Sequence, residues 1–358
     1  MNKIIGVFIL VALTSGCATI TGPSVSPEEI KQAKEGLEVK SLAFRLGQIK
    51  RINTIGHSLV RTIPKEDIKG KPQPFLGLFC IPRGKVAERL FNIHPDKGIV
   101  VAFILEGTPA YEAGLKAGDV VLAVGKKNIN HVGATIENGL TAGEKVELLV
   151  LRNGQTMDIP IKVSEIPFAV SFTLVDDQSV NAAAGTNQIF VTYGLINFAK
   201  SDDEIAAVIG HELGHLTRGH VMRMQGSNII SIIAAIGLGI AAETVSPGSG
   251  STVMRGVGGI GDVFKARFSR DLEREADYFG VKYLYLAGYD PQVAVSVHER
   301  FAIEIPSSMT RDFFSSHPSS PERSVRIKKT IEELHQLYPL NKPSAHQEEN
   351  VQPLTGGK

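Results

Sequence analysis

The sequence is short of net charge, of long apolar runs and of cysteine, and these shortages narrow the class of protein that it can encode. Its formal charge of +1 gives no reason to expect nucleic acid as a partner, because phosphate binding needs a basic surface. The apolar stretch 228–242 is about 15 residues long, whereas a membrane span needs roughly 20. With 358 residues, 43% hydrophobic and 21% charged, the composition is that of a globular chain long enough for two or three domains.

The first residues have the pattern of a targeting segment. A basic start at Lys3 is followed by about ten apolar residues, 4–13, and then by small residues that end at Cys17. Because this run is too short to cross a bilayer, we predict a signal peptide over residues 1–16 and a linker over residues 17–27. The small residues before the cysteine resemble a bacterial lipoprotein cleavage site, which implies a lipid anchor on Cys17. A plain secretory signal or an uncleaved anchor is the alternative.

Whether Cys80 can form a disulfide bond within the chain depends on whether Cys17 carries lipid. If Cys17 carries lipid, Cys80 has no partner within the chain, so a disulfide framework is excluded. Cys80 is then expected to be a small, buried residue of a strand. Ala18 follows Cys17, where an aspartate would favour retention in the inner membrane, so the resemblance to lipoproteins implies the outer membrane.

Apolar spacing divides the rest of the chain. Residues 28–69 begin with helical periodicity, which predicts one long helix or two abutting ones before a proline-rich break. Residues 70–165 are rich in strand patterns, and residues 166–340 begin with two strands and continue as helices. Residues 341–358 form a polar tail that we predict to be disordered. The predicted fold class is α+β, with a mostly helical domain that has a small sheet and a second, β-rich domain.

The strand-rich segment contains a specific pattern. Two apolar strands bounded by glycines precede a predicted hairpin whose turn is Asn153-Gly154. Together with "GTPAYEAGLKAGDVVLAV", the segment resembles a PDZ domain of the bacterial, protease-associated kind. The resemblance implies that the N–H groups near Leu76, Gly77 and Leu78 bind a peptide C-terminus while the peptide adds as a strand. A PDZ domain that serves only as a rigid spacer is the alternative.

The stretch "GHELGHLTRGH" places three histidines close together. Ser201 and the acidic residues after it predict the start of a helix that carries His211 and His215. These two residues are four apart and differ by about 40° around the helix axis, so both imidazoles face one point. Two imidazoles that face one point can bind a metal ion together. Glu212 beside them can reach a water on that metal without binding the metal itself. His220 is turned away from that face, and we expect it to lie behind the ligands or to pack beyond the helix.

An open zinc site needs three protein ligands and leaves one position free. The third ligand is expected in "RFSRDLEREADYFGVKYLYLAG", a predicted helix with four carboxylates. Glu273 and Asp277 share a flank with small and apolar residues. Asp271 and Glu275 share the opposite flank with Lys282, which indicates a solvated face. We therefore predict Glu273, in preference to Glu275, as the third ligand, and Asp277 as the hydrogen-bond acceptor of a ligating histidine.

The pair "HELGH" and "SRDLEREAD" resembles the zinc metallopeptidase family that includes HtpX, BepA and the CAAX prenyl endopeptidases, which have a gluzincin fold. In that family the first glutamate of an E-x-x-x-D motif ligates zinc, which implies one Zn²⁺ per chain with Glu273 as a ligand and Asp277 as the motif's aspartate. "SHPSSPER" matches the family's HP…R motif at His317 and Arg323. His317 is implied to stabilise the tetrahedral intermediate or to occupy the open zinc position at rest. A histidine in a turn before proline is the alternative.

The resemblance implies hydrolysis of peptide bonds. Zinc held by His211, His215 and Glu273 would lower the pKa of a water. Glu212 would then act as the general base and pass the proton to the leaving amine. The segment "VNAAAGTNQIFVTYGLI" resembles the family's edge strand, so residues 188–191 are expected to hold extended protein or peptide substrates.

Three hypotheses for the whole chain follow. The first is a zinc endopeptidase of the bacterial envelope that faces the periplasm and cleaves misfolded or misassembled envelope proteins, with the PDZ domain inserted between residues 28–69 and 166–340. The alternative is a PDZ-mediated peptide-binding or chaperone-like lipoprotein with latent or lost proteolysis, and the retained Glu212 favours the enzyme. A multi-span membrane enzyme lacks the long apolar segments it would need. The stretch 228–242 is expected to form a buried helix or a flap over the active site, or to touch the membrane; the oligomeric state is left open.

Overall fold

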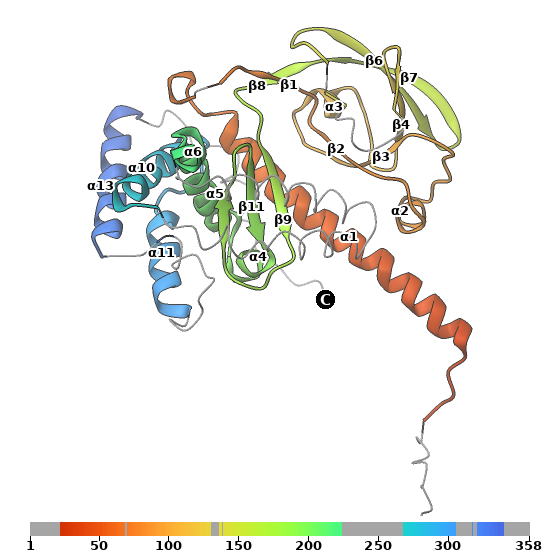
Figure 1. The fold of residues 1–358 in the computed structure, drawn as a ribbon, viewed down its shortest axis with the longest axis horizontal. Helices are drawn as coiled ribbons and strands as arrows, with labels where there is room; N and C mark the ends of the chain where they lie inside the picture. The colour runs from red at the N-terminus through yellow and green to blue at the C-terminus, as the bar shows by residue number, and fades with distance from the viewer. Residues whose placement is uncertain are drawn as a thin grey trace, which may run out of the picture.

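The computed structural model describes residues 22–68, 70–129, 136–137, 139–223, 268–305, 317 and 321–339 (Figure 1). The predicted signal peptide with Cys17, the apolar stretch 228–242 and the polar tail 341–358 lie outside these residues. Within the described part of the chain, no helix is both long enough and apolar enough to span a membrane.

The helix α1 (Pro27–Val60) is one continuous element. It begins with a capping box, in which the Ser26 hydroxyl accepts from the N–H of Glu29 and the Glu29 carboxylate accepts from the N–H of Ser26. Its first half is largely exposed, and its second half buries one face, which includes Ile52 and Ile55. Gly56 lies directly against the ring of Phe172 in β9 (Ser171–Val175), where a β-carbon would overlap the ring. The absence of a side chain therefore lets the helix and the strand touch.

The β-rich part is built around a sheet with the order β2-β3-β4-β6-β7, in which neighbouring strands are antiparallel. These strands are β2 (Leu78–Ile81), β3 (Ile99–Ile104), β4 (Val120–Val124), β6 (Lys145–Arg152) and β7 (Gln155–Lys162). The shorter elements of this part are β5 (Lys127–Asn128), which pairs with β4, and the helices α2 (Lys85–Phe91) and α3 (Pro109–Glu112). The predicted hairpin between β6 and β7 is confirmed: Asn153 and Gly154 have φ angles of 51° and 78°, which a tight two-residue turn requires.

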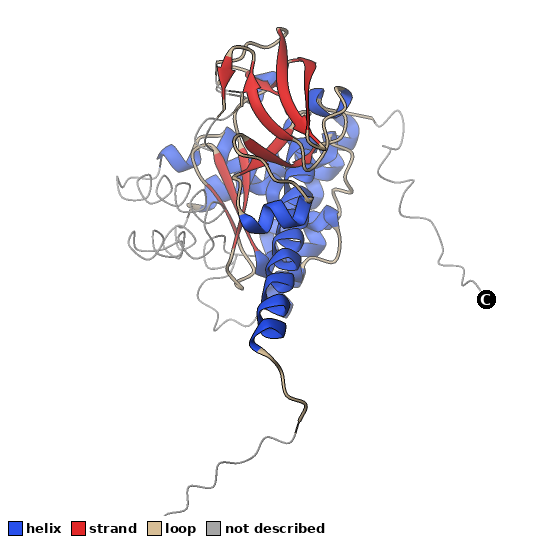
Figure 2. Ribbon diagram, turned by 90° about the vertical axis from the view of Figure 1, so that its right-hand side faces the viewer, coloured by secondary structure: helices blue, strands red, loops and turns tan. Residues whose placement is uncertain are grey.

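The chain enters and leaves the β-rich part at one place, where β1 (Gln73–Phe75) pairs antiparallel with β8 (Ser164–Ile166). One face of the larger sheet packs on α1, since Val100 of β3 and Ile52 of α1 belong to the same apolar cluster. Arg89 of α2 adds an ion pair with Glu35 of α1, at 3.1 Å. Figure 2 shows the larger sheet at one end of the molecule and the N-terminal half of α1 projecting at the other.

A second sheet has the order β10-β11-β9, with β10 (Ala182–Ala184) and β11 (Gln188–Thr192). β11 pairs with β9 in parallel and with β10 in antiparallel orientation, so both of its sides are used. The expectation that residues 188–191 form a substrate-binding edge is therefore wrong, because a strand accepts an added peptide only on an unpaired side. Among the described residues, the edges of this sheet are β9 and β10.

The helical part contains α4 (Tyr193–Phe198), α5 (Asp202–Thr217), α6 (His220–Arg223), α10 (Arg270–Leu286), α11 (Val293–Glu304) and α13 (Pro321–Leu337). A 3₁₀ turn, η1 (Lys65–Asp67), follows α1. α5 contacts α1, α10, α11 and the strands β10 and β11, so it lies at the centre of this part (Figure 1). A helical part with a small sheet and a separate β-rich part confirm the predicted α+β fold class.

Candidate metal centre

The helix α5 carries the predicted histidine pair. The hydroxyl of Ser201 caps its N-terminus by accepting from the N–H of Glu204, and three acidic residues in the first turn interact favourably with the helix dipole. The helix is buried along most of its length, with His211 3% exposed and His215 0% exposed. Their ring centroids are 4.7 Å apart, so the helical spacing brings both imidazoles to one place.

Glycines allow α5 and α10 to cross with their backbones in contact. A β-carbon on Gly214 would stand 2.6 Å from the carbonyl oxygen of Ala276. One on Gly280 would stand 2.8 Å from the backbone nitrogen of His211, and one on Gly210 would stand 3.0 Å from the carbonyl oxygen of Gly280. Larger residues would push the helices apart. This close crossing determines how far the carboxylates of α10 reach toward the imidazoles of α5.

Four buried side chains meet at this crossing, and one ligand-capable atom of each lies within 4.8 Å of the others: His211, His215, Glu273 and His317. The Nε2 atoms of His211 and His215 are 3.1 Å apart, and Nε2 of His215 lies 3.4 Å from Oε1 of Glu273. Nδ1 of His317 lies 2.9 Å from the same oxygen and 3.2 Å from Nε2 of His211. The structure thus brings together the three predicted ligands and His317. Imidazoles with one carboxylate form a donor set that suits Zn²⁺.

Glu212 lies beside this cluster, and its side chain is 0% exposed. Its Oε1 lies 3.4 Å from Nε2 of His317. Among the described residues, neither of its carboxylate oxygens has a hydrogen bond. A buried carboxylate without hydrogen bonds is costly unless another group satisfies it. The environment of Glu212 therefore fits a site that takes up a further polar group, such as the water of a metal centre.

Asp277 lies behind His211, with its Oδ1 2.9 Å from Nδ1 of the imidazole. Arg323 of α13 binds both oxygens of Asp277, at 2.6 Å and 2.8 Å. Its guanidinium also donates to the carbonyl oxygen of His317 at 3.1 Å. The HP…R motif pointed to Arg323, but its ion pair with Asp277 was not expected. Through these bonds Arg323 holds together α10, α13 and His317.

Carboxylates and imidazoles are buried side by side in and around the cluster. Burial opposes the ionisation of Glu273, but the adjacent His317 and the hydrogen bonds from two further histidines hold the pKa of its carboxyl well below its usual range. Burial alone would lower the pKa of His211, but the hydrogen bonds to Asp277 and Glu273 outweigh burial and raise that pKa to about 9. Carboxylates that draw a proton onto an imidazole also favour a divalent cation in its place, so these residues fit zinc.

The prediction that Lys282 marks a solvated flank of α10 is wrong. Lys282 is 8% exposed, and its Nζ lies 2.8 Å from Oδ2 of Asp67 in η1. Burial of this lysine is possible because Asp67, remote in sequence, supplies the opposite charge. Glu275 is not among the cluster residues: its carboxylate contacts Arg218 and His220.

The loop predicted to bind a peptide C-terminus leads into β2 at Leu78. Gly77 has a φ angle of 78°, and a β-carbon there would overlap the side chain of Thr108, so only glycine fits. Among the described residues, β2 pairs with β3 alone, which leaves its other side unpaired. The backbone N–H of Leu76 is hydrogen-bonded to the carboxylate of Glu137, whose pKa is raised by burial. A peptide carboxylate would have to displace Glu137 from this loop.

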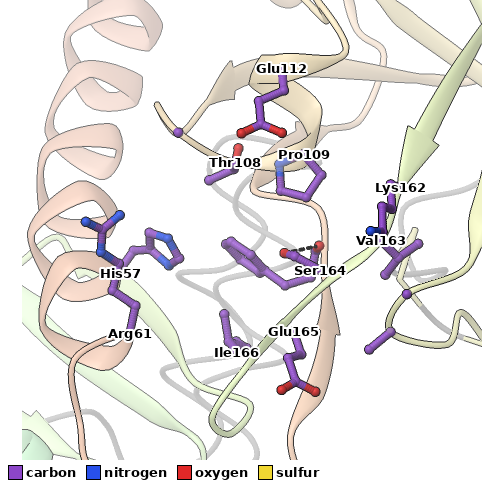
Figure 3. A pocket seen from close by; sticks show the side chains of 14 residues that line it. His57, Arg61, Thr108, Pro109, Glu112, Lys162, Val163, Ser164, Glu165 and Ile166 are labelled. Atoms are coloured by element: carbon purple, nitrogen blue, oxygen red, sulfur yellow. Dashed lines mark hydrogen bonds between the residues drawn. The ribbon is translucent and has the colours of Figure 1, made fainter.

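A pocket of about 710 Å³ lies between α1 and the β-rich part (Figure 3). His57 of α1 and Arg61, which caps the C-terminus of that helix, line it on one side, and Lys162 and Glu165 line it from the β-rich part. The ring of His57 stacks on Phe75 with the centroids 4.7 Å apart. None of the residues of the metal cluster lines this pocket, so it is a feature of the contact between the two parts of the chain.

Two family profiles match the sequence. The profile of peptidase family M48 matches residues 153–331, and that of the PDZ domain matches residues 74–163. The mitochondrial metalloendopeptidase OMA1 of Arabidopsis thaliana is 36% identical over 152 residues, which are 42% of this chain and 29% of that protein. The metalloprotease YcaL of Escherichia coli is 31% identical over 166 residues, which are 45% of this chain and 62% of that protein. For the metalloprotease LoiP of the same organism the identity is 30% over 164 residues, 44% and 62% of the two chains.

The matched regions span less than two thirds of the length of each of these relatives. The M48 profile nevertheless covers half of the 358 residues and includes every member of the metal cluster. M48 peptidases bind zinc, which agrees with the buried histidines and glutamate at the crossing of α5 and α10. The expectation of a zinc metallopeptidase with a PDZ domain is thereby confirmed at the level of the family. The chain belongs to peptidase family M48.

Proposed function

We propose that the protein is a zinc-dependent endopeptidase of the bacterial cell envelope that cleaves misfolded or misassembled proteins. One observation carries the proposal: ligand-capable atoms of His211, His215, Glu273 and His317 lie within 4.8 Å of one another. The buried carboxylate of Glu212 lies beside them. Metal-dependent hydrolysis of a peptide bond needs this combination, because ligands, base and reacting atoms must meet at one point.

In this proposal His211, His215 and Glu273 would hold the zinc, and His317 would be a further ligand at rest. The chemistry that zinc supplies in such a site is Lewis acidity, which lowers the pKa of a coordinated water to about 7 and polarises a carbonyl. Asp277 accepts a hydrogen bond from Nδ1 of His211, which keeps the lone pair of Nε2 directed at the cluster.

Glu212 moves the proton in the proposed reaction. Its carboxylate takes a proton from the attacking water and passes it to the nitrogen of the leaving amine, so the C–N bond breaks after the new C–O bond has formed. His317 lies 3.4 Å from Glu212 and turns aside when the substrate enters. It then donates a hydrogen bond to the oxygen of the scissile carbonyl, where negative charge develops.

Extended, unfolded chains are the proposed substrates. Among the described strands, β10 lies at an edge of its sheet, and it contacts α5, so main-chain pairing along it would bring an extended substrate toward the cluster with little sequence preference. The PDZ domain would bind C-termini of substrates at Leu76, Gly77 and Leu78. The lipoprotein-like residues that end at Cys17 support a lipid anchor, with the enzyme facing the periplasm from the outer membrane.

Metal analysis of the purified full-length protein, combined with digestion of casein with and without a chelator, tests the proposal. We expect one zinc ion per chain, and we expect cleavage to stop with the chelator and to return when zinc is restored. Cleavage by protein that has been freed of metal would contradict the proposal. Zinc binding without cleavage would favour the alternative of a PDZ-mediated, chaperone-like lipoprotein whose proteolysis is latent or lost.

A further inference from the structure

His215 has a line of hydrogen bonds behind it, as His211 has Asp277 and Arg323 behind it. Nδ1 of His215 is 2.9 Å from Nδ1 of His220, and Nε2 of His220 is 3.1 Å from Oε2 of Glu275. Nε of Arg218 donates to the other oxygen of Glu275 at 2.6 Å. The side chain of His220 is 0% exposed, so both of its ring nitrogens are satisfied by protein groups in a closed environment.

The end of α5 explains how His220 reaches this place. On a continued helix, a residue five positions after His215 would turn away from the face of the histidine pair. The helix instead ends at Thr217 with Arg218 as its C-cap, and Gly219 has a φ angle of 69°, which is the left-handed conformation that reverses a chain after a helix. His220 then opens α6, and its ring lies at 75° to that of His215 with the centroids 5.0 Å apart.

The orientation of His215 determines where the protons of His215 and His220 lie. Nε2 of His215 faces Glu273 and the other cluster histidines, so its lone pair must be free for a metal and the proton must sit on Nδ1. That proton is donated to Nδ1 of His220, which therefore accepts. The proton of His220 is then on Nε2 and is donated to Glu275, a carboxylate that only accepts.

We propose that His220 and Glu275 are positioning residues that hold His215 in the tautomer and orientation needed for metal binding. The inference rests on the proposed metal site and assigns a task to two residues outside it. It also gives Glu273 and Glu275, two of the carboxylates of α10, different roles. Glu273 reaches the cluster directly, whereas Glu275 acts two bonds away through His220. Arg218, stacked on the ring of Phe279 at 4.4 Å, holds Glu275 in place.

The two histidines of α5 are thus supported differently. His211 contacts the carboxylate of Asp277 directly, at 2.9 Å. On its Nδ1 side, His215 reaches the carboxylate of Glu275 through a second imidazole, that of His220. A side chain at position 220 must therefore accept on one side and donate on the other. Glutamine can do both with its amide, whereas leucine has similar bulk and can do neither.

The test compares four variants of the full-length protein: His220→Leu, His220→Gln, Glu275→Ala and the control Asp271→Asn. Asp271 lies on the same helix, its side chain is 86% exposed, and it contacts Arg274 rather than the cluster. Zinc affinity is measured by competition with a chromophoric chelator, and the geometry of the site by the visible spectrum of the Co²⁺-substituted protein. Melting temperatures of the metal-free variants show whether each one is folded.

We expect His220→Leu to raise the zinc Kd by about 10–100-fold and to alter the Co²⁺ spectrum, as loss of an outer hydrogen-bond partner does. His220→Gln should recover most of the affinity and the original spectrum, Glu275→Ala should weaken binding, and Asp271→Asn should change nothing. Equal defects in His220→Leu and His220→Gln would overturn the proposal, because a packing role does not distinguish an amide from an alkyl group.

Glu275 provides an independent arm if His220→Leu does not fold, because its side chain is 30% exposed and its truncation leaves no buried cavity. Wild-type zinc affinity in Glu275→Ala would then overturn the inference. The wild-type measurement separates this failure from that of the proposed function. If the wild type binds zinc and cleaves casein while all variants bind zinc equally well, only the positioning role is lost. If the wild type binds no zinc, the proposed function is lost and the inference with it.

Discussion

The carbonyl oxygen of Ala276 lies 2.6 Å from the point where a β-carbon on Gly214 would stand, so α5 and α10 meet backbone to backbone. Gly214 stands directly before His215, and Ala276 directly before Asp277. The separation of the two helices, and with it the distance from the α10 carboxylates to the α5 imidazoles, therefore depends on the missing side chain at this contact.

Replacing Gly214 by alanine should separate the helices. The new methyl group meets backbone atoms, which cannot rotate away, so we expect a loss of stability of about 1–3 kcal/mol and a weaker zinc affinity. Denaturant unfolding and chelator competition measure the two effects. Gly47→Ala is the matched control, because Gly47 is an exposed residue of α1 with no atom within 4 Å of a β-carbon. That change should raise stability slightly through helix propensity. Wild-type zinc affinity in Gly214→Ala would show that the crossing tolerates a larger separation.

Replacing Glu212 by glutamine should separate binding from catalysis. The amide cannot take a proton from water, so we expect kcat for an unfolded substrate to fall by about 10²–10⁴-fold while zinc stays bound. Zinc content and kcat are measured on the same preparation. Glu299→Gln, at a half-exposed glutamate of α11, should leave both unchanged. Substantial cleavage by pure Glu212→Gln would remove the assigned general base from the mechanism.

Removal of zinc should destabilise the protein, because the metal binds the folded cluster and compensates its buried carboxylates. At a free zinc concentration 100 times the Kd, the expected stabilisation is about 2.7 kcal/mol. Thermal unfolding with added zinc and with chelator measures it. Glu273→Ala should abolish the zinc dependence, since this carboxylate is the cluster's contribution from α10. An unchanged zinc-induced shift in Glu273→Ala would place the metal elsewhere.

Acid should weaken the contact between α1 and the β-rich part. Burial, with a smaller effect from Arg61, lowers the pKa of His57 from 6.5 to about 4. Between these two values the folded state therefore binds fewer protons at His57 than the unfolded state does. The stability that depends on neutral His57 is complete above pH 6.5 and is lost as the pH falls from 6.5 to about 4. The loss amounts to at most about 3 kcal/mol. His57→Phe keeps an aromatic ring against Phe75 and should reduce the acid dependence of the unfolding midpoint. His94→Phe, at an exposed histidine, should not reduce it.

Glu137 should compete with peptide ligands of the PDZ domain. Its carboxylate accepts a hydrogen bond from the N–H of Leu76, at the loop assigned to a peptide C-terminus. We expect Glu137→Ala to tighten the binding of peptides with a free C-terminal carboxylate, as measured by fluorescence anisotropy. Amidated peptides should gain nothing, and Glu106→Ala, at an exposed residue before α3, should match the wild type. A weaker affinity in Glu137→Ala would mean that this carboxylate supports the loop and does not occupy it.

Features that depend on residues a few positions apart were predictable from the sequence. The spacing of His211 and His215 places both rings on one face of a helix, Ser201 caps that helix, and Asn153-Gly154 makes a tight turn. Each follows from the local geometry of a helix or a hairpin. The resemblance to known motifs also predicted the family and the meeting of distant segments, because the residues of these motifs lie together in the proteins of that family.

The tertiary structure alone decided which remote groups become partners. Lys282 is buried because Asp67 lies beside it, and β11 is an inner strand because β9 and β10 flank it. Glu275 contacts His220 because the chain turns at Gly219, just after the end of α5. Periodicity in the sequence identifies the face of an element but not the element that covers it. That choice depends on how all the elements pack at once, and here on glycines that let two helices touch.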